Sequence, residues 1–133
     1  MSPKKVRNRK RKKDRTPPEL FMKAKVEQQT AEGLTTMVIR VRKPALGELF
    51  AIVLRNLGDN RVRVQCADGN VRIGRIRGRM RKRAWIRVGD VVLVEPWYGL
   101  DEETKGDVKH RYRMNEKRVL EDRGMLKALE NYL

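Results

Sequence analysis

A run of short apolar segments separated by turn residues begins at Gly47, and it constrains the fold more than any other feature of this sequence. The first segment, residues 49–54, is continuously apolar, as expected of a central strand that is covered on both faces. Phe50 lies inside this run and is expected in the core. The turn-rich residues 56–60 follow directly. The sequence therefore predicts that a β-rich domain begins here.

A β-hairpin is predicted next. In residues 61–66, three apolar side chains alternate with polar ones and define one buried face; they are Val62, Val64 and Cys66. The dipeptide Asp68-Gly69 that follows is typical of a tight type I′ turn.

The second strand of this hairpin changes parity along its length. Val71 and Ile73 continue the apolar face, but Ile76 falls on the opposite face. We therefore predict a bulge near Gly74, because an extra residue would shift the register and let a small barrel turn a corner.

Two further strands and a helix complete the predicted domain. Residues 91–94 form a fourth strand, and residues 108–113 form a fifth after an acidic loop. Asn115 is a suitable N-cap for a helix, and Gly124 lies where a left-handed residue would end it. The expected fold class is mainly β, a five-stranded barrel followed by a short C-terminal helix. Residues 125–133 carry no assignment.

The N-terminal end has a different character. The first fifteen residues carry nine basic side chains against the single acid Asp14: Lys4, Lys5, Arg7, Arg9, Lys10, Arg11, Lys12, Lys13 and Arg15. Such a block cannot collapse on itself and is expected to be disordered until it meets a polyanion. A nucleic-acid-binding arm is the preferred interpretation, and a solubility tail or localisation address is the alternative.

The segment between this arm and the barrel is harder to assign. Residues 20–29 could form a marginal helix after Pro17-Pro18, or nothing stable when unbound. Residues 35–42 are rich in β-branched side chains and are expected to form an extended lead-in. The predicted organisation is a basic arm with a variable lead-in (1–34), a barrel (35–113) and a C-terminal helix with its tail (114–133).

The charge balance restricts the partners of the chain. There are 33 Lys and Arg residues against 17 Asp and Glu residues, giving a net charge of +16. A surface of this sign attracts polyanions, whether RNA, DNA or anionic lipid. No stretch approaches the roughly 20 apolar residues of a membrane span, and no apolar signal core follows the basic N-terminus. A cytoplasmic location is therefore expected.

No enzymatic chemistry is predicted. The chain has one histidine, His110, and one cysteine, Cys66, which is too few for a disulfide or a structural zinc site. Cys66 is expected to be a buried structural thiol. The acidic residues 101–103 suit a solvated loop better than a metal site. We expect neither a cofactor nor a metal ion.

Residues 75–87 are the most informative segment for function. Arginine or lysine occupies seven of these thirteen positions, and Met80, Trp85 and Ile86 are interleaved with them. Guanidinium groups pair with phosphate and stack on bases, and an indole offers a π-face to an unstacked nucleotide. The segment therefore indicates RNA binding. For Trp85 itself a place in the barrel core is an almost equal alternative.

Strand alternation adds a second group of cations to this surface. Arg61, Arg63 and Arg72 are predicted to point outward on adjacent strands of the hairpin, where like charges are unfavourable unless a polyanion is near. The predicted RNA-binding residues are Asn60, Arg61, Arg63, Arg72, Arg75, Arg77, Arg79, Arg81, Lys82, Arg83 and Trp85.

Three motifs in this order resemble the archaeal and eukaryotic translation initiation factor 1A family. They are N-R-V-x-V-x-C-x-D-G at residues 60–69, I-x-G-x-M-R-K-x-x-W-I at 76–86, and G-D-x-V-L-V-x-P-W at 89–97. The similarity covers roughly residues 39–124. The absence of a long acidic C-terminal tail favours the archaeal side of the family.

The resemblance implies an OB-fold protein at the A site of the small ribosomal subunit. It implies contact with decoding-region rRNA through residues 58–61 and 77–85, and with a neighbouring ribosomal protein. The basic arm would reach toward the initiator tRNA and the mRNA, and other initiation factors would be nearby. We expect a monomer when the protein is free. Whether residues 125–133 meet another factor stays open.

Two other functions fit the same composition. A general single-strand binder or RNA chaperone of the cold-shock type would use a similar barrel, but its platform of surface aromatic residues is missing from the central strands. The composition also fits a basic structural ribosomal protein, and only the family motifs argue against that alternative.

Overall fold

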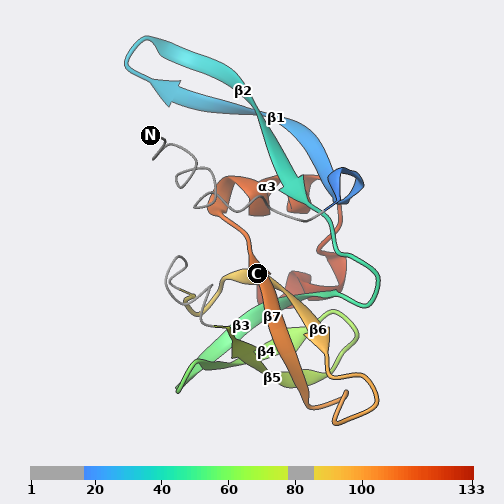
Figure 1. The fold of residues 1–133 in the computed structure, drawn as a ribbon. Coiled ribbons are helices and arrows are strands. Elements are labelled where there is room, and N and C mark those ends of the chain that lie inside the picture. The colour runs from blue at the N-terminus through green and yellow to red at the C-terminus, as the bar shows by residue number, and fades with distance from the viewer. Residues whose placement is uncertain (1–16, 78–85) are drawn as a thin grey trace, which may run out of the picture.

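The structure is a computed structural model that describes residues 17–77 and 86–133. The predicted disordered arm and residues 78–85 of the basic loop therefore lie outside the described residues. The described chain comprises a β-hairpin, a closed barrel and a C-terminal helical segment (Figure 1).

The barrel has five strands, as predicted. They are β3 (Leu49–Gly58), β4 (Arg61–Cys66), β5 (Val71–Ile76), β6 (Val91–Pro96) and β7 (Lys105–Arg111). Their order around the barrel is β3-β4-β5-β7-β6, and β6 pairs with β3 to close it. Among the strand pairs of the barrel that the structure describes, β5–β7 is parallel and the other four are antiparallel. The mainly β fold with a closed five-stranded barrel is thus confirmed.

Both faces of β3 and β6 are buried, because two hydrophobic clusters share these strands. Ala51 and Val53 point into the barrel interior, whereas Phe50 and Ile52 point outward. Phe50 and Ile52 belong to a hydrophobic cluster outside the barrel, which we call the outward cluster. The β-hairpin contributes Ala24 and Val41 to it, and the C-terminal segment contributes Val119, Leu120, Leu126 and Leu129. This confirms that residues 49–54 form a strand covered on both faces, with Phe50 in the core, and it explains why they are continuously apolar.

Close approach of strands explains two glycines in the barrel wall. A Cβ atom at Gly74 would lie 2.9 Å from Val108 Cγ2, and one at Gly106 would lie 2.6 Å from Val94 Cγ1. The predicted bulge near Gly74 is wrong, because β4 and β5 pair without a register shift. Register shifts occur instead in the β3–β4 pair, between Val53 and Arg55 and between Asn56 and Gly58, and in the β6–β7 pair, between Leu93 and Val94.

The turn chemistry also differs from the prediction. The β4–β5 hairpin is present, but its turn is not type I′, because Gly69 alone among the turn residues has positive φ, at +95°. Asp68 instead accepts a hydrogen bond from the Asn70 N–H (3.1 Å). Positive φ at both central residues occurs in the preceding turn, at Asp59 (+50°) and Asn60 (+60°).

Helix α3 (Met114–Asp122) follows the barrel. The predicted end is confirmed, since Gly124 adopts φ +71° just after the helix. The predicted N-cap at Asn115 is wrong by two residues: Arg113 caps the helix, and its N–H donates to Glu116 Oε1 at 2.7 Å. The Glu116 carboxylate satisfies an N-terminal donor from inside the first turn, as in a capping box.

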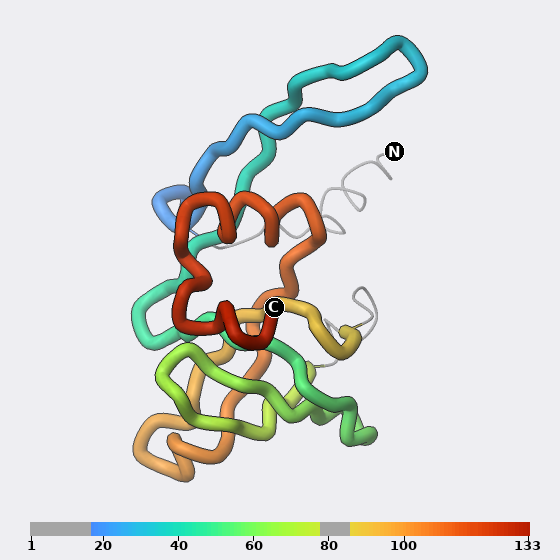
Figure 2. Tube along the Cα trace, turned by 180° about the vertical axis from the view of Figure 1, so that it is seen from behind, coloured from blue at the N-terminus to red at the C-terminus, as the bar shows by residue number. Residues whose placement is uncertain are grey.

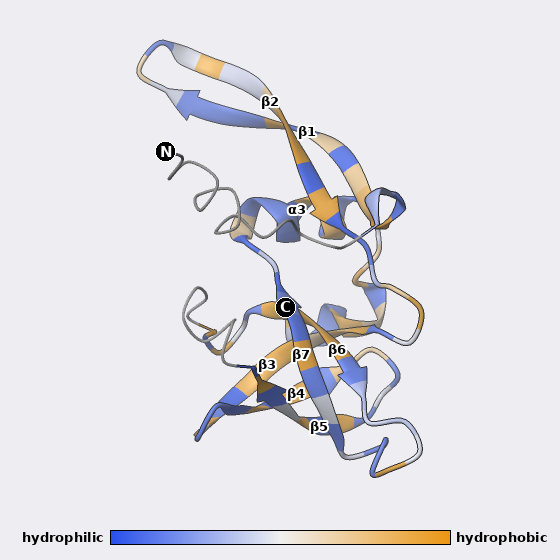
Figure 3. Ribbon diagram, viewed as in Figure 1, coloured by the Kyte–Doolittle hydropathy of each residue, from blue (hydrophilic) through white to orange (hydrophobic). Residues whose placement is uncertain are grey.

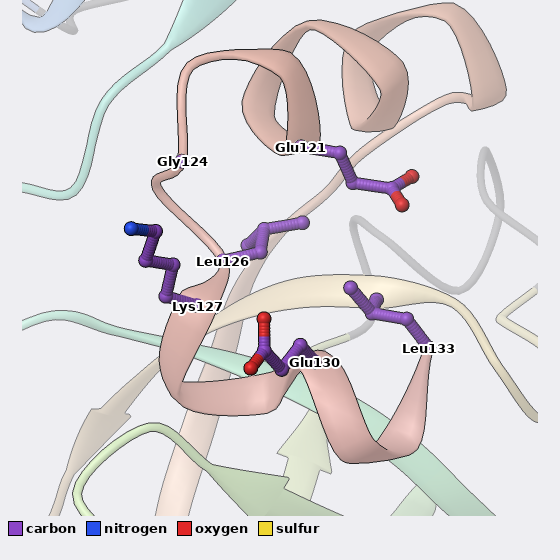
Figure 4. A pocket seen from close by; sticks show the side chains of 6 residues that line it. All are labelled: Glu121, Gly124, Leu126, Lys127, Glu130 and Leu133. Atoms are coloured by element: carbon purple, nitrogen blue, oxygen red, sulfur yellow. The ribbon is translucent and has the colours of Figure 1, made fainter.

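The unassigned tail forms a 3₁₀ helix, η2 (Lys127–Tyr132). Leu126 and Leu129 are buried in the outward cluster together with Leu120 of α3. Figure 2 shows this segment between α3 and the barrel. A small pocket lies where α3 meets η2, lined by Glu121, Gly124, Leu126, Lys127, Glu130 and Leu133 (Figure 4). The tail is therefore part of the folded unit.

The predicted marginal helix over residues 20–29 is wrong, because these residues form a strand. After a 3₁₀ turn, η1 (Pro18–Leu20), strand β1 (Phe21–Thr30) pairs antiparallel with β2 (Gly33–Arg42). The strand is favoured because Met22, Ala24 and Val26 alternate on one face and pack on the outward cluster. The extended lead-in predicted at residues 35–42 is confirmed as most of β2. Figure 3 shows hydrophobic residues at the base of this hairpin, beside α3.

Candidate nucleic-acid interface

The outward cluster covers only one side of the barrel and leaves the outer face of β4, β5 and β7 exposed. A row of directly opposed residues crosses four strands on this face: Arg55, Arg63, Ile73 and Lys105. Arg61 and Arg75 form a second opposed pair beside it. Side chains at opposed positions project from the same face. The result is a basic surface with Val71 and Ile73 exposed within it.

The bulge in β3 is what brings Arg55 into this row. The register shift after Val53 moves Arg55 opposite Arg63, so its side chain projects outward with the β4 arginines. No carboxylate lies within ion-pair distance of Arg55, Arg61 or Arg63 in residues 17–77 and 86–133. Three adjacent uncompensated guanidinium groups favour an external polyanion.

Asp107 organises the neighbouring part of the same face. Its Oδ1 accepts hydrogen bonds from Arg75 Nε (3.0 Å) and from the Trp97 indole N–H (3.1 Å). Arg77 Nη2 lies 3.5 Å from Oδ2. The Arg75 and Arg77 side chains are nevertheless about half exposed, at 51% and 56%. Asp107 therefore orients these two guanidinium groups without preventing their contact with a phosphate.

Trp97 supplies an aromatic ring at this position. The Arg75 guanidinium lies 5.4 Å from the ring centroid, and Lys105 Nζ lies 5.6 Å from it. Both distances are within the range of cation–π attraction. A ring flanked by cations suits stacking against a base while the cations contact the backbone.

Of the six predicted site residues that the structure describes, five are exposed and one, Arg72, is buried. Arg61, Arg63, Arg75 and Arg77 are exposed on or beside this face, and Asn60 is exposed in the turn before β4; the RNA contacts of all five stay predictions. The predicted residues Arg79, Arg81, Lys82, Arg83 and Trp85 lie outside the described residues. The alternatives for Trp85, core or RNA contact, therefore stay open.

The prediction that Arg72 points outward is wrong. Its side chain is only 3% exposed. It donates through Nη1 and Nη2 to the Asp68 carboxylate, at 3.0 and 2.8 Å, and through Nε to the Glu102 carbonyl, at 2.6 Å. Arg72 thus lies on the inward parity of β5, and Val71 and Ile73 lie on the outward one. Alternation alone could not show this, because the apolar residues were assumed to face the core.

The Arg72–Asp68 pair makes stability depend on pH. The Arg72 guanidinium holds the pKa of Asp68 below its usual value. Burial by itself would lower the pKa of Arg72, but the bonds to Asp68 raise it on balance. A carboxylate with a lowered pKa in the folded state stabilises the protein above its unfolded pKa of about 4, and this stabilisation is lost as pH falls toward the folded value.

We expect Asp68→Asn to lower the free energy of unfolding by about 1 to 3 kcal/mol at pH 7, because a charge-assisted bond to a buried cation is lost. The difference from wild type should begin to shrink below about pH 4, where Asp68 becomes protonated in the unfolded state, and should vanish only below the lowered pKa of the folded state. Urea denaturation at pH 7 and pH 3 measures this. Asp101→Asn, which alters a more exposed pair with Lys105 at 3.9 Å, is the control and should change little. An equal effect of the two variants at pH 7 would contradict the assignment.

Sequence reasoning missed three residues of the candidate face, which are Arg55, Trp97 and Lys105. The sequence could not place Arg55 on this face, because the outward direction of its side chain depends on the bulge in β3. The sequence could not place Lys105 on this face either, because the parallel pairing of β5 with β7 joins segments about thirty residues apart. For Trp97 a signal existed, since an aromatic residue follows Pro96 at the end of a strand that neighbours basic ones.

Comparison with known proteins identifies the family. A family model described as translation initiation factor 1A / IF-1 matches residues 38–131. The translation initiation factor 1A of Methanothermobacter thermautotrophicus is 50% identical over 93 residues, which cover 70% of this chain and 93% of the relative. One from Haloquadratum walsbyi is 53% identical over 87 residues (65% and 88%), and one from Pyrobaculum aerophilum is 43% identical over 89 residues (67% and 76%).

The segment matched by the family model contains most of the helices and strands of the structure. Residues 38–131 include the whole barrel, α3 and most of η2, but they exclude β1 and the first half of β2. The match covers well over half of the chain, and the matched residues form the closed barrel and its basic face. The resemblance noted in the motifs is thereby confirmed, and this chain belongs to the translation initiation factor 1A / IF-1 family.

Proposed function

We propose that this chain, as a member of its family with a role in translation initiation, binds the decoding region at the A site of the small ribosomal subunit. There it would promote the placement of initiator tRNA and mRNA. The observation that carries this proposal is the exposed row of cations across β3, β4, β5 and β7 in a barrel of this family. Phosphate groups of rRNA supply the charge that this face lacks.

The remaining partners follow from the same proposal. The basic residues of the arm (1–15) and of the loop (79–85) are proposed to contribute further contacts with rRNA, initiator tRNA and mRNA. A neighbouring ribosomal protein and other initiation factors complete the surroundings. The protein works without catalysis, as a monomer when free, in the cytoplasm. No helix among residues 17–77 and 86–133 has the length and apolar character that crossing a bilayer requires.

Sedimentation tests the proposed function. Purified small subunits, complete ribosomes and deproteinised rRNA are each mixed with the protein and pelleted. Selective binding to small subunits supports a role at initiation. Binding of comparable strength to any single-stranded RNA would instead favour the cold-shock type of binder, and stoichiometric retention on complete translating ribosomes would favour a structural ribosomal protein.

We expect binding to small subunits to weaken steeply as salt rises. The logarithm of the affinity should fall by about 0.7 to 0.9 per phosphate neutralised for each tenfold increase in salt, because condensed counterions are released on binding. Titrations of labelled protein from low to physiological ionic strength measure the slope. A flat response would contradict an interface made by the arginine row.

A further inference from the structure

The distal half of the β1–β2 hairpin, residues 27–38, projects away from the rest of the described chain (Figures 1 and 2). We call residues 27–38 the distal hairpin. Ten of its twelve residues are exposed, and only Thr30 and Gly33 are partly covered. The family model begins at residue 38, so the barrel's family membership does not account for this element.

The charge of the distal hairpin is opposite to that of the chain. At 33 cations in 133 residues, a segment of twelve would contain about three lysines or arginines on average. The distal hairpin contains none, and it carries Glu27 and Glu32 instead. A segment of this composition repels phosphates and suits a partner with positive charge.

Exposed aliphatic side chains accompany these carboxylates. Leu34 is 65% exposed and Val38 is 56% exposed. Positions 34 and 38 share one face of β2, because side chains two and four residues apart in a strand point the same way. On that face Glu27 lies opposite Thr36, between the two aliphatic positions. Lys25 lies opposite Val38 on the same face, at the end nearer the barrel. The face thus offers two apolar contacts with a carboxylate between them and a lysine beside the second.

The strand edges of the distal hairpin are also open. β1 and β2 form a two-stranded sheet, and no further strand of the described chain pairs with either. Exposed edges are normally protected by lysine, proline, a bulge or short length. Here each strand has ten residues, their register is unbroken, and the distal hairpin contains neither lysine nor proline. Such an edge is suited to receive a strand from a partner.

The base of the hairpin is firmly attached to the folded body. Ala24 and Val41 are buried in the outward cluster. Arg123 Nη2 donates to the Lys23 carbonyl at 2.9 Å, and Tyr112 Oη donates to the Arg42 carbonyl. Arg42 in turn binds both oxygens of Glu48, at 2.8 and 3.1 Å. An arm anchored in this way presents its distal half in a defined direction, which lowers the entropic cost of docking.

We propose that the distal hairpin docks a basic segment of a protein component of the small ribosomal subunit. This segment adds as a strand along the free edge of β2, places apolar side chains on Leu34 and Val38, and directs its cations toward Glu27 and Glu32. The contact rests on the proposed binding to small subunits and is additional to the contacts of the barrel.

The double variant Leu34→Lys/Val38→Lys tests this proposal. Both positions are exposed, so the fold should persist, and a thermal melt checks this. Lysines on this face remove the apolar contacts, repel a basic partner and protect the edge, while they can only favour contact with RNA. The matched control is Leu46→Lys/Leu100→Lys, which adds the same charge at two other exposed leucines.

The probes are salt-washed small subunits and the deproteinised rRNA extracted from them. We expect the hairpin variant to bind subunits at least about tenfold more weakly than the control, with no loss of affinity for rRNA. Equal binding of the two variants to subunits would overturn the docking site while leaving the proposed function in place. An equal loss for subunits and rRNA would indicate an RNA contact and overturn it as well. Failure of the wild-type protein to bind subunits would overturn both.

A photocrosslinking residue gives an independent readout. Benzoylphenylalanine introduced at Thr36, between the two aliphatic positions, is irradiated in complexes with purified small subunits. Crosslinked species that survive ribonuclease and disappear with protease are expected. Adducts to RNA alone, or no adducts from a variant that still binds subunits, would contradict docking to a protein.

Discussion

Replacing Arg55, Arg61 and Arg63 with serine is expected to weaken binding to small ribosomal subunits at least a hundredfold. Each charge-assisted contact to a phosphate is worth about 1.5 to 3 kcal/mol, so losing even two of the three removes about 3 to 6 kcal/mol. A tenfold change in affinity corresponds to about 1.4 kcal/mol. Titration of labelled protein with purified subunits at fixed salt measures the effect.

The same substitution should leave the fold intact. The three arginines are exposed, and none pairs with a carboxylate in the described chain. Surface substitutions of this kind usually change stability by about 0.5 kcal/mol or less each, and relief of repulsion among like charges partly offsets any loss.

A charge-matched control distinguishes binding through a specific face of the barrel from binding that depends only on net charge. It replaces three exposed cations of the C-terminal segment by serine, namely Arg113, Arg118 and Lys127. If this control lost as much affinity as the variant of the barrel face, binding would depend on overall charge and the arginine row would not be the interface. Wild-type affinity of the barrel variant would place the RNA contacts elsewhere.

Leu129→Ala is expected to lower the free energy of unfolding by about 2 to 5 kcal/mol, because it opens a cavity in the outward cluster. Leu129 is fully buried although only four residues follow it in the sequence. Urea denaturation followed by circular dichroism measures the loss. Lys127→Ala, in the same 3₁₀ helix but exposed, should change stability by about 0.5 kcal/mol or less. Equal stability of Leu129→Ala and wild type would show that the tail does not contribute to the folded core.

Local pattern and turn chemistry determined much of this protein from sequence. The five barrel strands were predicted because short apolar segments separated by turns have few other solutions. The end of α3 at Gly124 was predicted because glycine adopts positive φ at no steric cost. The charge of +16 predicted a polyanionic partner independently of the fold. Motif order identified the family, which the comparisons confirmed.

Other features depended on contacts between distant segments, which no local pattern contains. Arg72 was assigned outward because apolar neighbours were expected to face the core, yet Asp68 and the Glu102 carbonyl satisfy its charge inside. For residues 21–30 the local sequence does not distinguish a strand from a marginal helix. The strand forms because its apolar side chains pack beside α3.

The candidate face shows the same division between sequence and tertiary structure. Its arginines in β4 follow from simple alternation, which is a property of any strand. Arg55 joins them only because a bulge in β3 shifts the register, and Lys105 joins them only because β5 pairs with β7 in parallel. The sequence by itself therefore determined that a basic barrel of this family would form. The tertiary structure decided which cations share one face, because that depends on which strands become neighbours and in what register.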